Sequence, residues 1–456
     1  MRHPSPSPSL ADLRLHAAIA AAAGIAVALL FPRQAPDTER FLATARNLAE
    51  NGIFSLDGAT PSVRDFPLLP WLLALARKVG GGDGQAALRI LNGLCLGATA
   101  LAVARGTALL LDERQPHLPG TGFAPPWLPP LLALWGTALW PTQLGSTLFV
   151  LTEPLFTALF LWANLLLATE IGAAAAAGPR PGRWALAGTI FGLASLTRSL
   201  ALPYAALALP LAAGLAWWQQ RRRRGGAANG NAIAGLRAGA LAGLMLLCIV
   251  GPWSWRNYRV TDGRFIPVSV GEGLGLAVGA AQEWRGEYPD DLDPRDPLMA
   301  GKGLTLAAAD AELKRQAWAT IKADPAAWLR LAPLKLKRLW LDVPGGKRQI
   351  RSGWLVATLA ALNLGLLAAA AAGYWLGRRR LLTGWFLLPP LYFSAVHTLL
   401  FGMARFRIPA EPFLILAAAA AGGRLLATAA QRGKQDRPNP PDRSDQTDRT
   451  DQPDPP

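Results

Sequence analysis

Apolar residues along the chain gather in about ten long runs that are separated by shorter polar segments. Each run approaches the roughly 20 residues that an α-helix needs to cross a hydrocarbon core about 30 Å thick. The pattern predicts an all-α polytopic membrane protein of about ten transmembrane helices. The predicted spans are 15–31, 88–111, 127–142, 150–169, 184–200, 201–219, 232–253, 353–376, 382–402 and 411–429.

Two segments between the runs are too long to be simple connectors: about 32–87 and about 254–352. The first contains Phe66 to Val79, an apolar stretch too short to span and bounded by prolines and Gly80, which predicts a helix lying in the membrane interface. In the second, Leu, Ala and Trp recur at helical spacing among Lys and Arg from Leu304 to Leu341, which predicts further amphipathic helices. We expect both loops to face outward and to carry the working surface.

The basic residues indicate the orientation of the helices. The formal net charge is +16, which in a soluble protein would suggest nucleic acid, but with 51% hydrophobic residues and a mean hydropathy of +0.22 the surplus is better interpreted as a topology signal. Lys and Arg collect in short cytoplasmic loops. With the N-terminus inside, the cytoplasmic side of the inner (cytoplasmic) membrane carries Arg180, Arg183 and the run from Arg221 to Arg224. Lys347 falls on the outer side and does not fit this pattern, but it belongs to a long loop, where the rule is weak.

The predicted domain organisation has three parts. Residues 1–14 form a cytoplasmic N-terminus, and the transmembrane domain covers 15–429. The first run is kept as a helix and not a signal peptide, because Pro32-Arg33 follows it and not a small-residue cleavage site. From residue 430 the chain consists of repeated Asp-Arg, Asp-Gln and Pro units, which predicts a disordered cytoplasmic tail over 430–456.

Charged residues at the outer ends of the predicted helices are candidates for chemistry, because a charge near a membrane helix is expensive to keep. Guanidinium groups suit phosphate, and a carboxylate can accept a proton from an attacking hydroxyl. Together they suit group transfer from a lipid phosphate. The candidates that the predicted topology brings to one side are Asp37, Glu153, Arg198, Arg405 and Arg407.

Each candidate also has a structural interpretation. Glu153 can pair with Arg198 or cap a helix, and Arg405 and Arg407 can anchor lipid headgroups. Asp37 can be an ordinary solvated loop acid. The two cysteines and four histidines are scattered, so no metal site or disulfide framework is encoded, and no cofactor is predicted. The sequence does not exclude the binding of a divalent ion, because Asp37, Glu39 and Glu153 offer hard oxygen ligands.

Several segments, taken together and in order, resemble the GT-C type membrane glycosyltransferases that depend on polyprenyl-phosphate sugars, the superfamily of protein O-mannosyltransferases and the aminoarabinose transferase of lipid A. The first outer loop, from Asp37 to Asn47 and on to Arg64 and the following prolines, resembles the family's loop of an Asp and an aromatic residue before an apolar helix. Further similar segments are Thr152-Glu153-Pro154, Gly192 to Arg198, Pro252 to Tyr258 and Arg405 to Pro412.

The resemblance implies an inverting enzyme in which Asp37 is the base and arginines hold the donor phosphate. The residues so assigned are Arg405, Arg407, Arg256 and Arg198 for the phosphate, with Glu153, Arg64, Asn257 and Glu39 in support. Its partners would be the membrane, a polyprenyl-phosphate sugar and an acceptor hydroxyl on a lipid, glycan or protein, and no nucleic acid. Asp65-Phe66 departs from the family, where a Pro pair is often seen.

A transporter or flippase of lipid-linked sugars is the alternative. Transporters tend to have duplicated halves and broken helices with polar groups at the membrane midplane. In this sequence the polar residues gather at the outer ends of the helices instead, which favours transfer.

Overall fold

The computed structural model describes residues 10–112, 125, 127–174, 178–223, 229–285, 287, 304–343 and 352–435. Within these ranges the protein is helical and contains no strand, only an isolated bridge between Ser55 and Pro61. An all-α polytopic membrane fold is thereby confirmed. The predicted disordered tail lies outside the described residues from 436 onward, and the last helix continues to Gln435.

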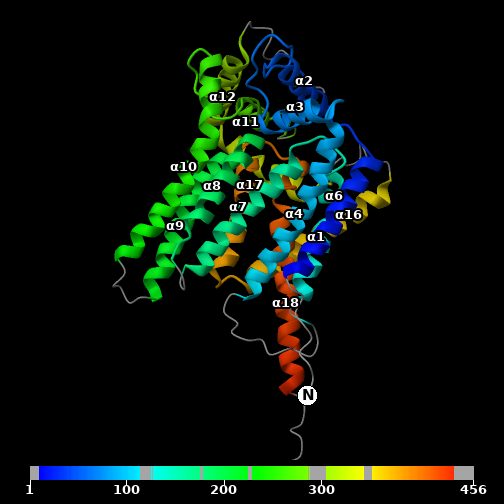
Figure 1. The fold of residues 1–456 in the computed structure, drawn as a ribbon, viewed down its shortest axis with the longest axis vertical. Helices are drawn as coiled ribbons and strands as arrows, with labels where there is room; N and C mark the ends of the chain where they lie inside the picture. Colours follow the sequence, from blue (N-terminus) through cyan, green and yellow to red (C-terminus); the bar gives the residue numbers. More distant parts are fainter. Residues whose placement is uncertain are drawn as a thin grey trace, which may run out of the picture.

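Ten helices follow the ten predicted runs and form the body of the protein (Figure 1). They are α1 Leu10–Leu30, α4 Gln85–Asp112, α5 Leu128–Ala138, α7 Glu153–Ala173, α8 Pro181–Thr197, α9 Ala201–Arg223, α10 Asn229–Val260, α16 Gly353–Leu376, α17 Leu381–Leu399 and α18 Glu411–Gln435. Seven of them are long and apolar enough to cross a membrane; α5, α8 and α17 are the other three. With only 11 residues, α5 is shorter than its predicted run. The backbone adopts an extended conformation at Trp140, which separates α5 from the short helix α6 Pro141–Ser146.

Contacts between helix ends show that α7, α8 and α9 alternate in direction. The start of α7 meets the end of α8 through Glu153 and Arg198, at one end of the bundle. At the opposite end, Gln219 near the end of α9 donates to the carbonyl of Ile171 near the end of α7, at 2.9 Å.

Four helices cap one end of the bundle, and we call them the crown (Figure 1). They are α2 Pro36–Asn51, α3 Leu68–Gly80, α11 Glu272–Ala280 and α12 Leu306–Ala323. The predicted short helix near residues 66–79 corresponds to α3, and the amphipathic stretch 304–341 becomes α12, α13 Pro325–Arg330 and α14 Ala332–Trp340. The sequence pattern did not predict α2 or α11.

The helices of the body pack through aromatic residues and close backbone contacts. Phe160 in α7 is fully buried and contacts the rings of Phe191, Tyr204 and Phe393. A Cβ at Gly188 would lie 2.0 Å from the carbonyl oxygen of residue 242, so only glycine allows α8 and α10 to approach this closely. Small residues at such crossings are typical of membrane helices.

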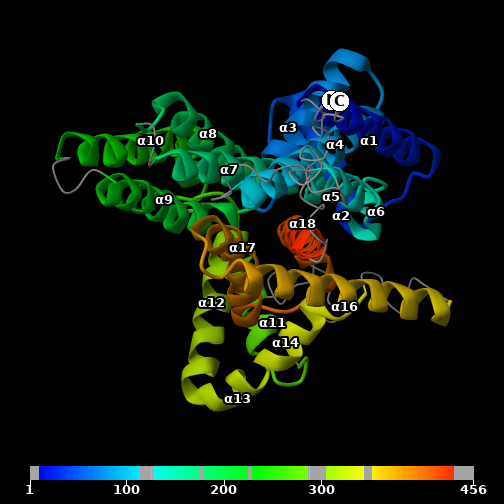
Figure 2. The same ribbon diagram turned by 90° about the horizontal axis from the view of Figure 1, so that it is seen from below.

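Helix α18 lies in the middle of the molecule, as the view along the long axis shows (Figure 2), where it contacts α4, α5, α16 and α17. Before it, the short 3₁₀ helix η2 Ala404–Arg407 contacts α14. Gly402, ahead of η2, lies so close to Lys335 that a Cβ there would stand 2.2 Å from the lysine carbonyl oxygen. The first half of α14 therefore fixes the path of the chain into η2.

Candidate active site

Four helix ends meet where the crown joins the bundle, and each brings one charged side chain. Asp37 lies in the first turn of α2, Glu153 is the first residue of α7, Arg198 is the C-cap of α8, and Arg405 lies in η2. The Nε of Arg405 binds Glu153, and its Nη1 lies 3.1 Å from an oxygen of Asp37. The Nη1 of Arg198 lies 2.8 Å from the same Glu153 oxygen. The predicted convergence of these four residues is therefore present in the structure.

The local sequence explains how Asp37 reaches this position. Pro36 is the first residue of α2, where its fixed φ and missing N–H suit a helix start. Phe41, one turn later, is buried against Leu69 and Leu73 of α3 and anchors the helix. Asp37 thus stands at the positive end of α2, where free backbone N–H groups stabilise a carboxylate.

Two further charged residues, Arg40 and Asp65, extend the network, and the sequence reasoning missed both. An Nη of Arg40 lies 3.3 Å from the second oxygen of Asp37, and its Nε lies 2.6 Å from Asp65. Thr44 also donates to Asp65, at 3.4 Å. Burial raises the pKa of Asp65, and Arg40 partly offsets this effect. The spacing of Asp37 and Arg40, one helical turn apart, was the signal that could have identified Arg40.

The network alternates in charge and changes in exposure along its length. The side chains of Glu153 and Asp65 are buried in the protein and 0% exposed, whereas those of Asp37 and Arg405 are each 29% exposed. Burial lowers the pKa of Arg405, but Glu153 and Asp37 together raise it above its usual value, so this guanidinium stays charged. We call these six residues the charged cluster: Asp37, Arg40, Asp65, Glu153, Arg198 and Arg405.

Arg407, the second arginine of the η2 motif, lies in a different environment. Its side chain is 3% exposed, and its Nε lies 2.9 Å from Glu411, which is fully buried. Its Nη1 donates to the carbonyls of Leu339, at 3.2 Å, and Asp342. Gln143 donates to the other oxygen of Glu411, at 3.1 Å. The structure therefore does not bring Arg407 to the charged cluster; it ties the end of α14 to the start of α18.

Arg256 and Asn257 also hold segments together. Arg256 donates to the carbonyls of Ser62, at 2.6 Å, and Phe54, at 3.2 Å, and its guanidinium lies over the ring of Trp253. The fully buried amide of Asn257 donates to the carbonyls of Ile266 and Val268. These two residues fasten the end of α10 to both outer loops, and neither forms a hydrogen bond or ion pair with Asp37 or Arg405.

The remaining predicted residues stand at the edge of the site. Glu39 is exposed on α2, and Arg64 is half-buried, with its backbone N–H donating to the hydroxyl of Ser62. The three acids that the sequence offered for a divalent ion do not gather, because Arg405 lies between Asp37 and Glu153. Among the described residues, no group of three or more His, Cys, Asp or Glu side chains could hold a metal ion.

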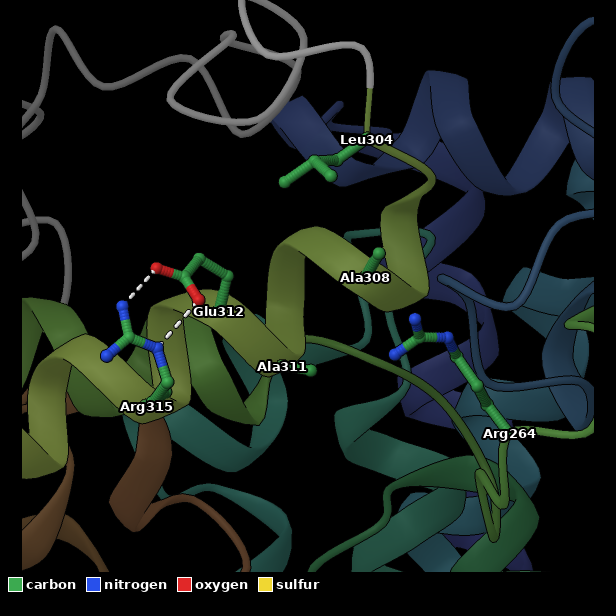
Figure 3. Close-up of a pocket in the computed structure, with 6 residues that line it drawn as sticks. All are labelled: Arg264, Leu304, Ala308, Ala311, Glu312 and Arg315. Carbon is green, nitrogen blue, oxygen red and sulfur yellow. Dashed lines mark hydrogen bonds and ion pairs between the residues drawn. The ribbon is translucent and has the colours of Figure 1, made fainter.

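An open pocket of about 530 Å³ lies elsewhere on the crown (Figure 3). Arg264 reaches into it from one side, and Arg315, which is paired with Glu312 at 2.6 Å, lies on the other. Leu304, Ala308 and Ala311 complete its lining. No residue that the sequence assigned to the site lines this pocket.

The chain matches no family model and none of the curated proteins. It resembles the archaeal oligosaccharyltransferase AglB from Archaeoglobus fulgidus, solved in complex with an inhibitory peptide and a dolichol-phosphate, with a TM-score of 0.53 and 15% identity over 94% of this chain and 52% of that chain. This chain thus spans about half the length of AglB.

Two other solved structures also match over most of this chain. ArnT from Cupriavidus metallidurans, bound to undecaprenyl phosphate, matches with a TM-score of 0.39 and 17% identity over 91% of this chain and 79% of that chain. The arabinosyltransferase EmbB from Mycobacterium smegmatis matches with a TM-score of 0.38 and 14% identity over 96% of this chain and 44% of that chain. The likeness to AglB shows that this chain shares the fold of the matched part of that oligosaccharyltransferase.

Proposed function

We propose that the protein is an inverting glycosyltransferase, which moves a sugar from a polyprenyl-phosphate donor to an acceptor hydroxyl at the outer face of the cytoplasmic membrane. The observation that carries the proposal is the position of Arg405. This guanidinium bridges Asp37, a half-buried acid at a helix start, and the buried Glu153. A candidate base and a candidate phosphate-binding group therefore touch each other at one end of a bundle with the GT-C fold.

Asp37 has the position that a general base needs. Its side chain is 29% exposed, and each of its oxygens has one guanidinium nitrogen as a neighbour. Because an ionised carboxylate has about four lone-pair sites, lone pairs remain for the hydroxyl of an acceptor. In the proposed step, Asp37 takes the hydroxyl proton, the hydroxyl oxygen forms a bond to the anomeric carbon, and the bond between this carbon and the phosphate oxygen breaks.

The contact between Asp37 and Arg405 links the two halves of this step. The leaving polyprenyl phosphate gains one negative charge as its bond to the sugar breaks. At the same time Asp37 loses its negative charge by accepting the proton, and its attraction for Arg405 weakens. The positive charge of Arg405 then becomes available to the phosphate, which stabilises the leaving group by fixed charges of the protein.

Among the four arginines predicted for the donor phosphate, the contacts favour Arg405 and Arg198. Both pair with Glu153. Two guanidinium groups and one carboxylate give these three residues a net positive charge when Asp37 is left out. Planar guanidinium groups can bind phosphate through two parallel hydrogen bonds. We infer that Arg407 and Arg256 act as scaffold residues, because their N–H groups already bind Glu411 or backbone carbonyls.

The outward orientation of the site is part of the proposal. It is supported by the run Arg221 to Arg223, which ends α9 at the end of the bundle opposite to the charged cluster. A cysteine placed next to Arg222 should resist a membrane-impermeant thiol reagent in intact cells, and a cysteine at exposed Glu39 should react. Reaction next to Arg222 and protection at Glu39 would reverse the proposed orientation.

The central experiment is single-turnover transfer with Asp37→Asn. A panel of undecaprenyl-phosphate hexoses and pentoses supplies the donor, and transfer to water or to an added acceptor is measured. Asn keeps the size of Asp but accepts no proton, so transfer should slow by roughly 100-fold or more while binding of undecaprenyl phosphate stays near normal.

Glu39→Gln is the matched control, because Glu39 is exposed and lies two residues after Asp37, so the variant removes a nearby negative charge without changing Asp37. It should change transfer by less than about threefold, since an exposed charge interacts weakly in water. Full transfer by Asp37→Asn would remove Asp37 from the mechanism. Binding of lipid-linked sugar without transfer by the parent protein would instead favour a flippase.

A further inference from the structure

Arg40 divides its guanidinium between two carboxylates. Its Nη2 lies 3.3 Å from Asp37, and its Nε lies 2.6 Å from Asp65, so the shorter contact goes to the interior residue. Asp65 lies in the loop before α3, and its side chain is fully buried. Arg40 is 24% exposed and reaches from this buried acid to the half-exposed Asp37. Arg40 and Asp65 together therefore connect the buried part of the first outer loop to Asp37, the proposed base.

We propose that Asp65 is a positioning residue for the reaction assigned to Asp37: by accepting the Nε–H of Arg40, it holds this guanidinium so that one nitrogen reaches Asp37 and the other lone pairs of Asp37 stay open to the acceptor hydroxyl. The inference rests on the proposed function. Without Asp65, Arg40 is free to turn its planar fork onto Asp37 and form two parallel hydrogen bonds. Asp37 would then have fewer lone pairs for a proton and a different orientation.

The burial of Asp65 supports a functional reason for its charge. A buried ion pair is weak evidence for stability, because desolvation offsets most of the attraction, and apolar residues of similar volume often replace such pairs without loss. Burial raises the pKa of Asp65, which shows that ionisation is opposed at this position. The oxygen that does not face Arg40 accepts from Thr44, at 3.4 Å. The short contact of this buried carboxyl with Arg40 directs it, through that guanidinium, toward Asp37.

The groups around Asp37 define what a test has to separate. From α2 it faces Arg40, and from η2 it faces Arg405. Behind these two arginines lie Asp65 and Glu153, and Arg64 acts on Asp65 electrostatically. Asp65 makes no hydrogen bond to Asp37, but the two carboxylates repel each other electrostatically, so the test has to separate this direct repulsion from the positioning of Arg40.

The experiment compares Asp65→Asn, Arg40→Gln and the double variant in steady-state transfer. Asp65→Asn should lower kcat about tenfold and change the KM for the undecaprenyl-phosphate donor less than twofold, because the base is displaced while the phosphate site at Arg405 is intact. The double variant should transfer at close to the rate of Arg40→Gln alone, since positioning by Asp65 acts through Arg40 and only the direct repulsion between the two carboxylates remains once Arg40 is gone. Equal slowing by Asp65→Asn in both backgrounds would overturn the inference.

Two further variants keep the test informative if Asp65→Asn folds poorly. Arg40→Lys leaves Asp65 in place but removes the fork that serves two carboxylates, and it should lower kcat to a similar extent. Thr44→Val removes the other side-chain contact of Asp65 and should leave kcat within twofold of the parent. A normal kcat for Arg40→Lys would also overturn the inference.

The inference and the proposed function fail in different ways. If Asp37→Asn is slow while Asp65→Asn and Arg40→Lys transfer normally, Asp65 has no positioning role and the proposed base stands. If all three variants are fully active, the proposed base falls together with the inference.

Discussion

Arg405 and Arg407 are two residues apart in one short helix, yet their surroundings are opposite. Arg405 is 29% exposed and shares its guanidinium between acids from two different helices. Arg407 is 3% exposed and binds Glu411 four residues away, together with two carbonyls near the end of α14. A 3₁₀ turn of about three residues per turn places neighbours two apart on different sides, so one motif serves both a site and a scaffold.

The difference teaches that residue type within a motif does not decide its role. Both arginines offer the same planar fork, and the resemblance to glycosyltransferases assigned both to the phosphate. What separates them is the number of N–H groups already committed to the protein and the access of a ligand to those that remain. Burial and partners, which only the fold supplies, therefore decide which guanidinium can bind a phosphate.

The largest expected effect is on stability, through Arg407→Ala. This change leaves Glu411 as a fully buried charge without its cation, which typically costs about 3–5 kcal/mol. Arg405→Ala should cost less, on the order of 1–2 kcal/mol, because Arg198 still pairs with Glu153. Unfolding of the purified variants in detergent measures both losses. Equal losses of unfolding free energy in the two variants would contradict the assignment of Arg407 to the scaffold and of Arg405 to the site.

The next effect is on donor binding, measured with undecaprenyl phosphate and the same two arginines. Arg405→Ala should weaken binding about tenfold or more, and Arg405→Lys should lie between it and the parent, because Lys keeps the charge but loses the fork. Arg407→Lys, where the protein folds, should bind nearly as well as the parent. Weaker binding by Arg407→Lys than by Arg405→Lys would exchange the two roles.

The smallest effect concerns Phe406, the residue between the two arginines. Its ring stacks on His397 at 4.7 Å and lies 5.5 Å from the guanidinium carbon of Arg198. Phe406→Leu keeps the apolar volume but removes the attraction between cation and ring, which is worth about 0.5–1 kcal/mol, so binding of undecaprenyl phosphate should weaken about two- to fivefold.

His397→Phe is the matched control for this change, because it preserves the stack on Phe406 and on Phe393. Binding by the control should equal binding by the parent. A loss as large with His397→Phe as with Phe406→Leu would attribute the effect to ring packing and not to the contact with Arg198.

The sequence predicted the membrane helices well, because runs of about 20 apolar residues have few alternatives to spanning a bilayer. It also predicted that Asp37, Glu153, Arg198 and Arg405 converge, since an even topology places all of them at one end. It missed α2, whose polar first turn carries no long apolar run, and overestimated the length of α5, where the chain turns at Trp140.

The sequence could not assign the individual contacts of the site. Asp65 attracted attention only as a departure from the family, and its partner Arg40 lies 25 positions away in the sequence. The commitment of Arg256 to the carbonyls of Ser62 and Phe54 depends on pairings across about 200 positions. Such pairings follow from tertiary packing, which local patterns do not encode.

Helix α18 is held at its start and near its middle, so its height in the bilayer depends on the thickness of the hydrocarbon core. At its start, Glu411 is held by Arg407, and near its middle Arg424 donates to the carbonyls of Leu110 and Gly373. The apolar segment that contains both ties, Glu411–Ala429, has 19 residues, or about 28 Å at 1.5 Å per residue. Because η2 leads directly into this rod, a thinner bilayer would leave Arg405 farther above the lipid headgroups and a thicker one would submerge it. Lipid chain length should therefore tune how easily a lipid-linked phosphate meets Arg405, without any change in the protein.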